Sequence, residues 1–335
     1  MFARLWSVKG KLNTQIRSPM VPTEWAKVAR TVLQGCCMGA ADVVPGVSGG
    51  TMALLLGIYP ELLASLGALS DKALWRDAAS LRWRSVLDRI NIRFLLPLGG
   101  GIGAALLVLA RAVEAVLSRW PLQLWSFFCG LILGSAIVIA LDRVAWRSDR
   151  ILLALASLAT VWLCMGLAPA VTPTAPWFLL LCGWLAVGAM LLPGVSGSWV
   201  LVMMGQYGPV LAAVNNQELD IVMAVLAGGA MGLVTVSRAL LWLYRRWTQP
   251  MLAVLAGIMA GSVRRIWPWN STFAPSNVDT GPGILGLTIP DITSEYAAST
   301  EFVTVCAAAL AGLALVYTLA RSSAASATSQ LEPPR

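Results

Sequence analysis

A five-residue motif, Pro-Gly-Val-Ser-Gly, occurs twice in the chain, and its residue types suit the binding of an anion. Pro-Gly ends a helix, and the serine that follows is a good N-cap for a new one. The new helix offers unpaired N–H groups and a partial positive charge, and glycine lets the backbone approach a ligand closely. The alternative is that each serine only caps its own helix. The residues that we expect to bind a phosphate are Ser48, Gly49, Gly50, Ser196, Gly197 and Ser198.

Charged residues in apolar surroundings are the other candidates, because a charge inside a membrane usually has a function. Arg264 and Arg265 end a short apolar run. Arginine binds phosphate in a fork geometry, so we expect this pair to assist, with snorkelling to the interface as the alternative. Asp42 is expected either to carry a coupling proton or cation or to hydrogen-bond the amides of its own tip. Arg111 is expected either to take part in gating or to pair with Glu114. The candidates for coupling or gating are Asp42, Glu61, Arg111 and Arg238.

Catalysis is not expected from these residue types. The chain has no histidine, which removes the usual general base and the Ser-His-Asp triad. Residues 46–50 match Gly-x-Ser-x-Gly, but that motif needs a strand–turn–helix context and a base. The six cysteines form no Cys-x-x-Cys pair, so we expect no metal site and no disulfide framework. We therefore expect neither an enzyme nor a cofactor.

The composition places these motifs in a membrane. Of the 335 residues, 58% are hydrophobic and only 12% are charged, against about half and about a quarter in soluble domains. The net charge of +8 is interpreted relative to a bilayer, and nucleic acid is not an expected partner. The predicted fold class is all-α, a polytopic integral membrane protein.

Two regions of the sequence read as pairs of short helices that are interrupted at the Pro-Gly. They are 25–44 with 51–69, and 177–192 with 199–214. We expect each pair to form a re-entrant hairpin, with two full spans as the alternative. A bilayer span needs about 20 apolar residues. The uninterrupted apolar runs are 94–118, 122–141, 151–168, 221–243 and 302–320, with a shorter run at 251–263.

The basic residues set the expected topology. Most of the 24 fall in segments that place both termini in the cytoplasm, as the positive-inside rule requires. The expected divisions are a cytoplasmic segment 1–24, a first repeat 25–145, a linking transmembrane helix 146–170, a second repeat 171–269, an extracytoplasmic loop 270–300, a last transmembrane helix 301–321 and a disordered cytoplasmic tail 322–335.

The two halves of the chain form an internal repeat. The motif recurs at an offset of 148; a second block aligns Gly99 with Gly228, and a third aligns Gly130 with Gly257. Three spans separate the two hairpins, so we expect the second half to be inverted relative to the first. Inverted repeats with broken helices are typical of secondary transporters, whose substrate binds near the midplane. The alternative is an old duplication that is kept only for packing.

Three segments resemble the signatures of a known bacterial family, the PopT-type undecaprenyl phosphate translocases. Residues 38–51, continuing through Gly57-Ile58-Tyr59, resemble the first signature. Residues 192–198 resemble the second, and Gly261-Ser262 with Trp267-Pro268-Trp269 resembles the third. The sequence departs from the family pattern after Tyr59, where Pro60 stands in place of an acid.

The resemblance, which covers roughly residues 25–320, implies a function. Such proteins act as flippases: they return undecaprenyl phosphate from the outer to the inner leaflet of the bacterial cytoplasmic membrane, for peptidoglycan and other envelope polymers. The implied partners are this polyprenyl lipid phosphate, the surrounding membrane lipid and a coupling ion, proton or sodium. Two alternatives stay open. One is a transporter of a small soluble anion, and the other is a non-transporting scaffold for envelope synthesis that depends on the basic loop 70–93.

Overall fold

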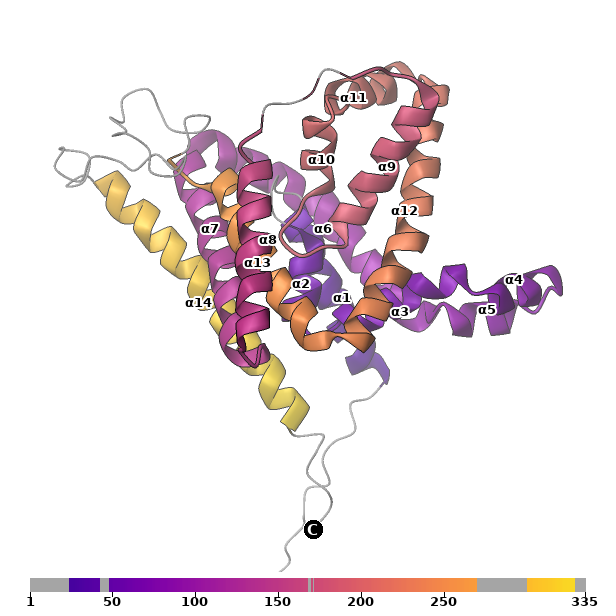
Figure 1. Ribbon diagram of the computed structural model, residues 1–335, viewed down its shortest axis with the longest axis horizontal. Helices are drawn as coiled ribbons and strands as arrows, with labels where there is room; N and C mark the ends of the chain where they lie inside the picture. Colours follow the sequence, from indigo (N-terminus) through magenta and orange to yellow (C-terminus); the bar gives the residue numbers. More distant parts are fainter. Residues whose placement is uncertain (1–23, 43–47, 168–169, 171, 270–299, 329–335) are drawn as a thin grey trace, which may run out of the picture.

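The computed structural model describes residues 24–42, 48–167, 170, 172–269 and 300–328 (Figure 1). Every regular element in that part of the chain is a helix. Four of its helices are long and apolar enough to cross a membrane, or five if one bent pair counts as a span. The prediction of an all-α polytopic membrane protein is therefore confirmed.

The first half of the chain begins with a broken hairpin and continues into longer helices. Its elements are α1 (Glu24–Asp42), α2 (Gly49–Leu55), α3 (Tyr59–Gly67), the 3₁₀ turn η1 (Ala68–Ser70), α4 (Lys72–Ala79), α5 (Trp83–Arg89), α6 (Ile92–Arg119), α7 (Pro121–Val138) with the π-helical turn η2 (Ile139–Arg143), and α8 (Ser148–Cys164).

The second half has the same order of elements without the α4–α5 insertion. Its elements are α9 (Pro176–Met190), α10 (Gly197–Met203), α11 (Tyr207–Asn216), α12 (Leu219–Arg246), α13 (Thr248–Ile266) and α14 (Thr300–Thr328). All six expected apolar runs fall on helices, although α8 has 17 residues and is shorter than the four span candidates.

Four pairs of helices pack along their length, and the pairs correspond between the halves. Helix α1 packs on α6, and the corresponding pair in the second half is α9 on α12. Helix α7 packs on α14, and its corresponding pair is α13 on α8. Glycines make these approaches close, as they do in membrane helix pairs. A Cβ on Gly101 would collide with the Val32 carbonyl oxygen, and one on Gly228 would collide with the Leu180 carbonyl oxygen.

These contacts correct the register of the second repeat block. The counterpart of Gly228 is Gly101 and not Gly99, because a Cβ on Gly99 would meet open space. The offset is therefore 127, the same as between Gly130 and Gly257, which approach carbonyl oxygens of α14 and α8 respectively. Three consecutive glycines start at Gly99, so identity alone could not choose between them.

Each hairpin contains one more helix than expected. Residues 51–69 and 199–214 were each expected to form one helix, but both break at a glycine with a left-handed backbone, Gly57 (φ +75°) and Gly205 (φ +67°). Glycine adopts this conformation without a Cβ penalty. Helices α10 and α11 consequently meet at 107°. Figure 1 shows that α9–α11 and α1–α3 reach the middle of the molecule from opposite ends.

Two other segments differ from expectation. Residues 70–93 are not a basic loop: α4 and α5 form a helical hairpin that projects from the body (Figure 1). Helix α14 continues to Thr328, so a disordered tail does not begin at residue 322; residues 322–328 are rich in alanine and serine, and alanine is the strongest helix former. The expected segments 1–24 and 270–300 fall, except for their last residues, outside the described residues.

Candidate substrate site at the hairpin tips

The tips of the two hairpins are hydrogen-bonded to each other. Thr51 and Tyr59 of the first hairpin are fully buried there, with 0% of each residue exposed. Tip-to-tip bonding at this depth satisfies polar groups that could not reach water. The bonds run from Gly194 N–H to Thr51 Oγ1 (2.9 Å), from Ser48 Oγ to the Met190 carbonyl (3.1 Å) and from Tyr59 Oη to the Leu191 carbonyl (3.0 Å).

The first tip already holds an internal carboxylate at the start of α2. The Gly49 amide donates to Asp42 Oδ1 at 2.7 Å. The Ser48 hydroxyl accepts from the Gly50 amide at 3.1 Å and also donates to the second tip. Asp42 thus hydrogen-bonds its own tip, and the groups expected to bind phosphate at Ser48, Gly49 and Gly50 are engaged by internal partners.

The second tip is chemically different from the first. At the offset of 148, Met190 stands where the first tip has Asp42. Ser196 is the N-cap of α10 by its backbone, with φ −99° and ψ 133°, but its side chain makes no capping hydrogen bond. Its hydroxyl instead lies 2.8 Å from that of Ser198. Ser196, Gly197 and Ser198 are all partly exposed, so this tip is the more accessible to a ligand.

Helix α13 connects the second tip to the arginine pair. Its residue Met259 lies directly against Gly194, and Arg264 follows about 8 Å further along the helix axis, at 1.5 Å per residue. The Arg264 guanidinium donates to the Trp162 carbonyl at 2.9 Å and lies 5.7 Å from the centre of the Trp162 ring. Arg264 and Arg265 are both partly buried.

Three expected site residues lie away from the tips. Glu61 accepts a hydrogen bond from Asn91 Nδ2 at 2.9 Å, at the start of α6. Arg238 lies beside Ser70, whose hydroxyl and carbonyl oxygens are 3.3 and 3.4 Å from its guanidinium. Arg111 is exposed on α6, and among the described residues no ion pair joins it to Glu114.

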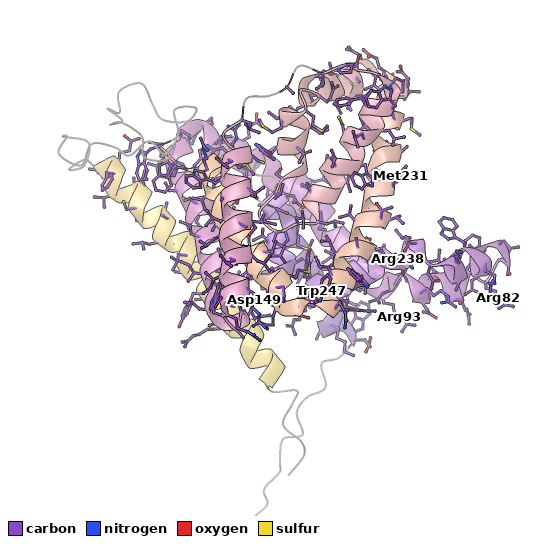
Figure 2. The ribbon with its side chains drawn as sticks, in the orientation of Figure 1. Arg82, Arg93, Asp149, Met231, Arg238 and Trp247 are labelled. Carbon is purple, nitrogen blue, oxygen red and sulfur yellow. The ribbon has the colours of Figure 1, made fainter. Side chains whose placement is uncertain are left out.

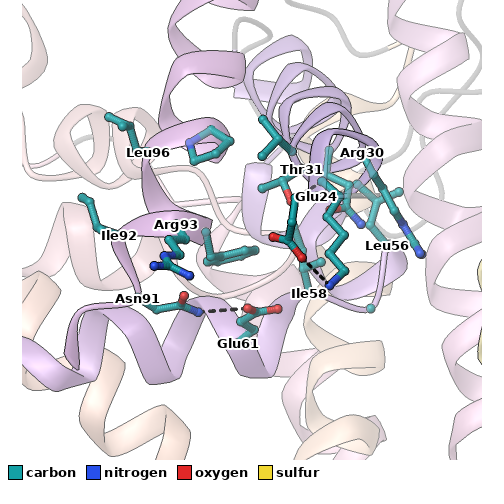
Figure 3. Close-up of a pocket in the computed structure, with 16 residues that line it drawn as sticks. Glu24, Arg30, Thr31, Leu56, Ile58, Glu61, Asn91, Ile92, Arg93 and Leu96 are labelled. Carbon is teal, nitrogen blue, oxygen red and sulfur yellow. Dashed lines mark hydrogen bonds and ion pairs between the residues drawn. The ribbon is translucent and has the colours of Figure 1, made fainter. Parts of the chain in front are cut away.

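A cavity of about 800 Å³ lies beside the first hairpin (Figure 3). It is bounded by the start of α1, the turn between α2 and α3, and the start of α6. Its charged lining residues are Glu24, Lys27, Arg30, Glu61 and Arg93. Sequence reasoning missed this cavity, because the residues come from three separate segments.

Sequence reasoning also missed Thr51 and Tyr59 as the residues that join the tips. Thr51 directly follows the first motif, and Tyr59 matches Tyr207 in the repeat. That match was uninformative about role, because Tyr207 is 45% exposed whereas Tyr59 is buried.

The fold and the site together define a class: a multi-pass α-helical membrane protein in which two broken hairpins meet inside the molecule. A model of the undecaprenyl phosphate translocase-like family matches residues 38–284. The chain belongs to that family, which confirms the resemblance seen in the sequence.

Two relatives carry the name polyprenyl-phosphate transporter. The protein from Vibrio cholerae is 39% identical over 246 residues, which are 73% of this chain and 79% of the relative. The protein from Staphylococcus aureus is 28% identical over 255 residues, 71% of this chain and 85% of the relative. Both are named as transporters, in agreement with the expectation that the chain is not an enzyme. No solved structure matches the chain.

Proposed function

We propose that this protein is a flippase for polyprenyl phosphate, and that it returns undecaprenyl phosphate from the outer to the inner leaflet of the bacterial cytoplasmic membrane. The names of the two relatives support the substrate. The observation that carries the mechanism is the direct hydrogen bonding between two hairpin tips that reach the middle of the molecule from opposite ends (Figure 1). Such a junction suits a site that is exposed alternately to either leaflet.

The second tip receives the phosphate in this proposal. Arg264 and Arg265 attract the headgroup from the outer side, and the hydroxyls and amides of Ser196, Gly197 and Ser198 then hold it. These three residues are partly exposed, and Met190 stands where the first tip has Asp42. The prenyl chain stays in the lipid, so only the headgroup needs a polar path.

Asp42 controls the first tip. Its carboxylate occupies the start of α2 by accepting the Gly49 amide, and like charges repel, so a phosphate cannot take that place while Asp42 is ionised. Protonation of Asp42 removes the repulsion and frees Ser48, Gly49 and Gly50 for the headgroup. A proton is therefore the coupling ion in this scheme.

The inverted arrangement completes the proposal. Both termini lie in the cytoplasm, the first hairpin enters from that side, and the second enters from outside. The two tips then alternate as the phosphate-binding end of the pathway.

The test is translocation in proteoliposomes that carry a fluorescent polyprenyl phosphate. Ser196→Trp should fill the second tip and abolish translocation, whereas Gly208→Ala, on the same hairpin but with open space around its Cβ position, should leave it intact. Translocation that persists in Ser196→Trp would reject the site. Failure of the unchanged protein to move the lipid, together with uptake of inorganic phosphate, would reject the substrate and favour the soluble-anion alternative.

A further inference from the structure

The cavity beside the first hairpin lies at the end of the molecule that we place in the cytoplasm. Figure 2 shows two of the residues that mark this end, Arg93 and Trp247, at a similar height, at the foot of the long helices. Arg93 lines the cavity. The cavity therefore opens where a headgroup would leave the protein for the inner leaflet.

The charges in this cavity leave a positive excess. The Lys27 ammonium pairs with the Glu24 carboxylate at 2.9 Å, and Glu61 is held by the Asn91 amide. Arg30 and Arg93 also line the cavity, and in the described part of the chain neither makes an ion pair. Figure 3 shows Arg93 on one side of the cavity and Arg30 on the other, with the Glu24 and Glu61 carboxylates between them. With three cations and two carboxylates the lining carries a net charge of +1, which favours an anion, and arginine is a strong partner for phosphate.

Most of the remaining lining residues are apolar, apart from Thr31, Gln34 and Asn91, and the apolar part reaches the surface. Ile92, Phe94 and Leu96 of α6 line the cavity together with the cations. Leu96 is 70% exposed and so continues the apolar surface toward the surrounding lipid. A ligand with an anionic head and a hydrocarbon tail fits this combination better than a fully hydrated ion does.

The fold itself does not require these cations, as the other half of the chain shows. At the offsets set by the helix contacts, Ala175 corresponds to Lys27, Phe178 to Arg30 and Asp220 to Arg93. The same helix pair forms in both halves with opposite charge at this position. The cations therefore serve one end of the molecule and not the packing of the repeat.

We infer that the cavity is a second phosphate site, in which Arg30 and Arg93 bind the phosphate monoester headgroup on the cytoplasmic side, with Lys27 beside them. The inference rests on the proposed function, because it places the headgroup at the end of the translocation path. The shared chemistry is a phosphate dianion, either on a prenyl lipid or free in solution.

Photo-crosslinking of the full chain tests the site and reports its location. The probe is a benzophenone-bearing prenyl phosphate, and the labelled peptides are identified by mass spectrometry. We expect label in residues 24–34 and 91–97, and at least a tenfold loss of that label in Arg30→Gln/Arg93→Gln, since hydrogen bonds to charged groups are among the stronger ones. The matched control is Arg82→Gln/Arg84→Gln, which removes the same charge from the projecting hairpin and should keep the label.

The outcomes separate this inference from the proposed function. Label that is unchanged in Arg30→Gln/Arg93→Gln would overturn the inference. Label that is lost equally in the control would also overturn it, because the loss would then be a general effect of positive charge. Loss confined to the first variant would support it. Competition by inorganic phosphate as strong as that by the lipid would assign the cavity to free phosphate. Absence of lipid translocation by the unchanged protein would reject the proposed function without bearing on where the probe binds.

Discussion

The amide of Gly194, at the second hairpin tip, donates a hydrogen bond of 2.9 Å to the hydroxyl of Thr51, in the first turn of α2, and both residues are buried. The bond joins positions 143 residues apart in the chain. Neither hairpin can therefore move alone without breaking a buried polar contact. Any change between inward and outward states must carry both tips together or exchange this bond for another.

Replacement of Thr51 by valine should destabilise the protein, because it leaves the Gly194 amide buried without a partner. An unsatisfied buried donor costs about 1–3 kcal/mol. Thr51→Ser keeps the hydroxyl and should lose much less. The measurement is thermal unfolding of the detergent-solubilised protein. Equal unfolding midpoints for the valine and serine variants would mean that the bond contributes nothing.

The helix contacts predict opposite results for two neighbouring glycines of α6. Gly101→Ala should lower stability by about 1–3 kcal/mol, the usual cost of overpacking, because the new Cβ collides with the Val32 carbonyl of α1. Gly99→Ala should have no such cost, because its Cβ enters open space. Thermal unfolding of the two variants side by side checks this. Similar losses in both would show that Gly101 is not the residue that packs against α1 as Gly228 packs against α9.

The projecting hairpin should respond to pH through Asp77. Hydrogen bonds from Ser85 and Arg89 hold the pKa of Asp77 below its usual value. A lowered pKa in the folded state stabilises at neutral pH, and that contribution disappears as the pH falls through the lowered pKa, below about 4. Asp77→Asn should therefore speed hydrogen exchange in α4 and α5 at pH 7, and this difference should shrink as the pH is lowered through the pKa of Asp77. A difference that stays the same size across the acid range would contradict the assignment.

Apolar patterning predicted the helices of this protein, because a continuous run of about 20 apolar residues crosses a bilayer as a helix, which satisfies its backbone hydrogen bonds within the segment. The repeat likewise predicted that the two tips correspond. It could not predict the environment of each tip, which depends on contacts between distant segments. The Ser48 hydroxyl, for example, donates a hydrogen bond to the carbonyl of Met190, which is 142 residues away in the sequence. The cavity of Arg30 and Arg93 was missed for the same reason.

Replacement of Asp42 by asparagine should leave the stability of the protein unchanged but abolish the coupling of translocation to protons. The amide oxygen of asparagine still accepts from the Gly49 amide, which Asp42 now binds at 2.7 Å. Its neutral side chain cannot take up a proton. We expect Asp42→Asn to unfold near the temperature of the unchanged protein, and its translocation rate to be independent of an imposed pH gradient. A gradient response equal to that of the unchanged protein would exclude Asp42 as the coupling group.

The two motif serines should respond differently to alanine. Ser48 is buried, and its hydroxyl both accepts from the Gly50 amide and donates to the Met190 carbonyl. Ser48→Ala should therefore cost about 1–2 kcal/mol, as the loss of an N-cap does. The Ser196 hydroxyl makes no capping bond and contacts only Ser198 among the described hydrogen-bond partners. Ser196→Ala should unfold near the temperature of the unchanged protein.

The translocation rate should identify Ser196 as the serine that contacts the substrate, although its replacement does not affect stability. In the proposed mechanism Ser196 contacts the phosphate, so Ser196→Ala should lower the translocation rate several-fold in proteoliposomes at a temperature at which both variants are folded. The translocation rate should fall less in Ser196→Thr, because threonine keeps the hydroxyl. If Ser196→Ala instead loses stability as Ser48→Ala does, with translocation unimpaired per folded molecule, the second serine only caps its helix and the phosphate must bind elsewhere along α13.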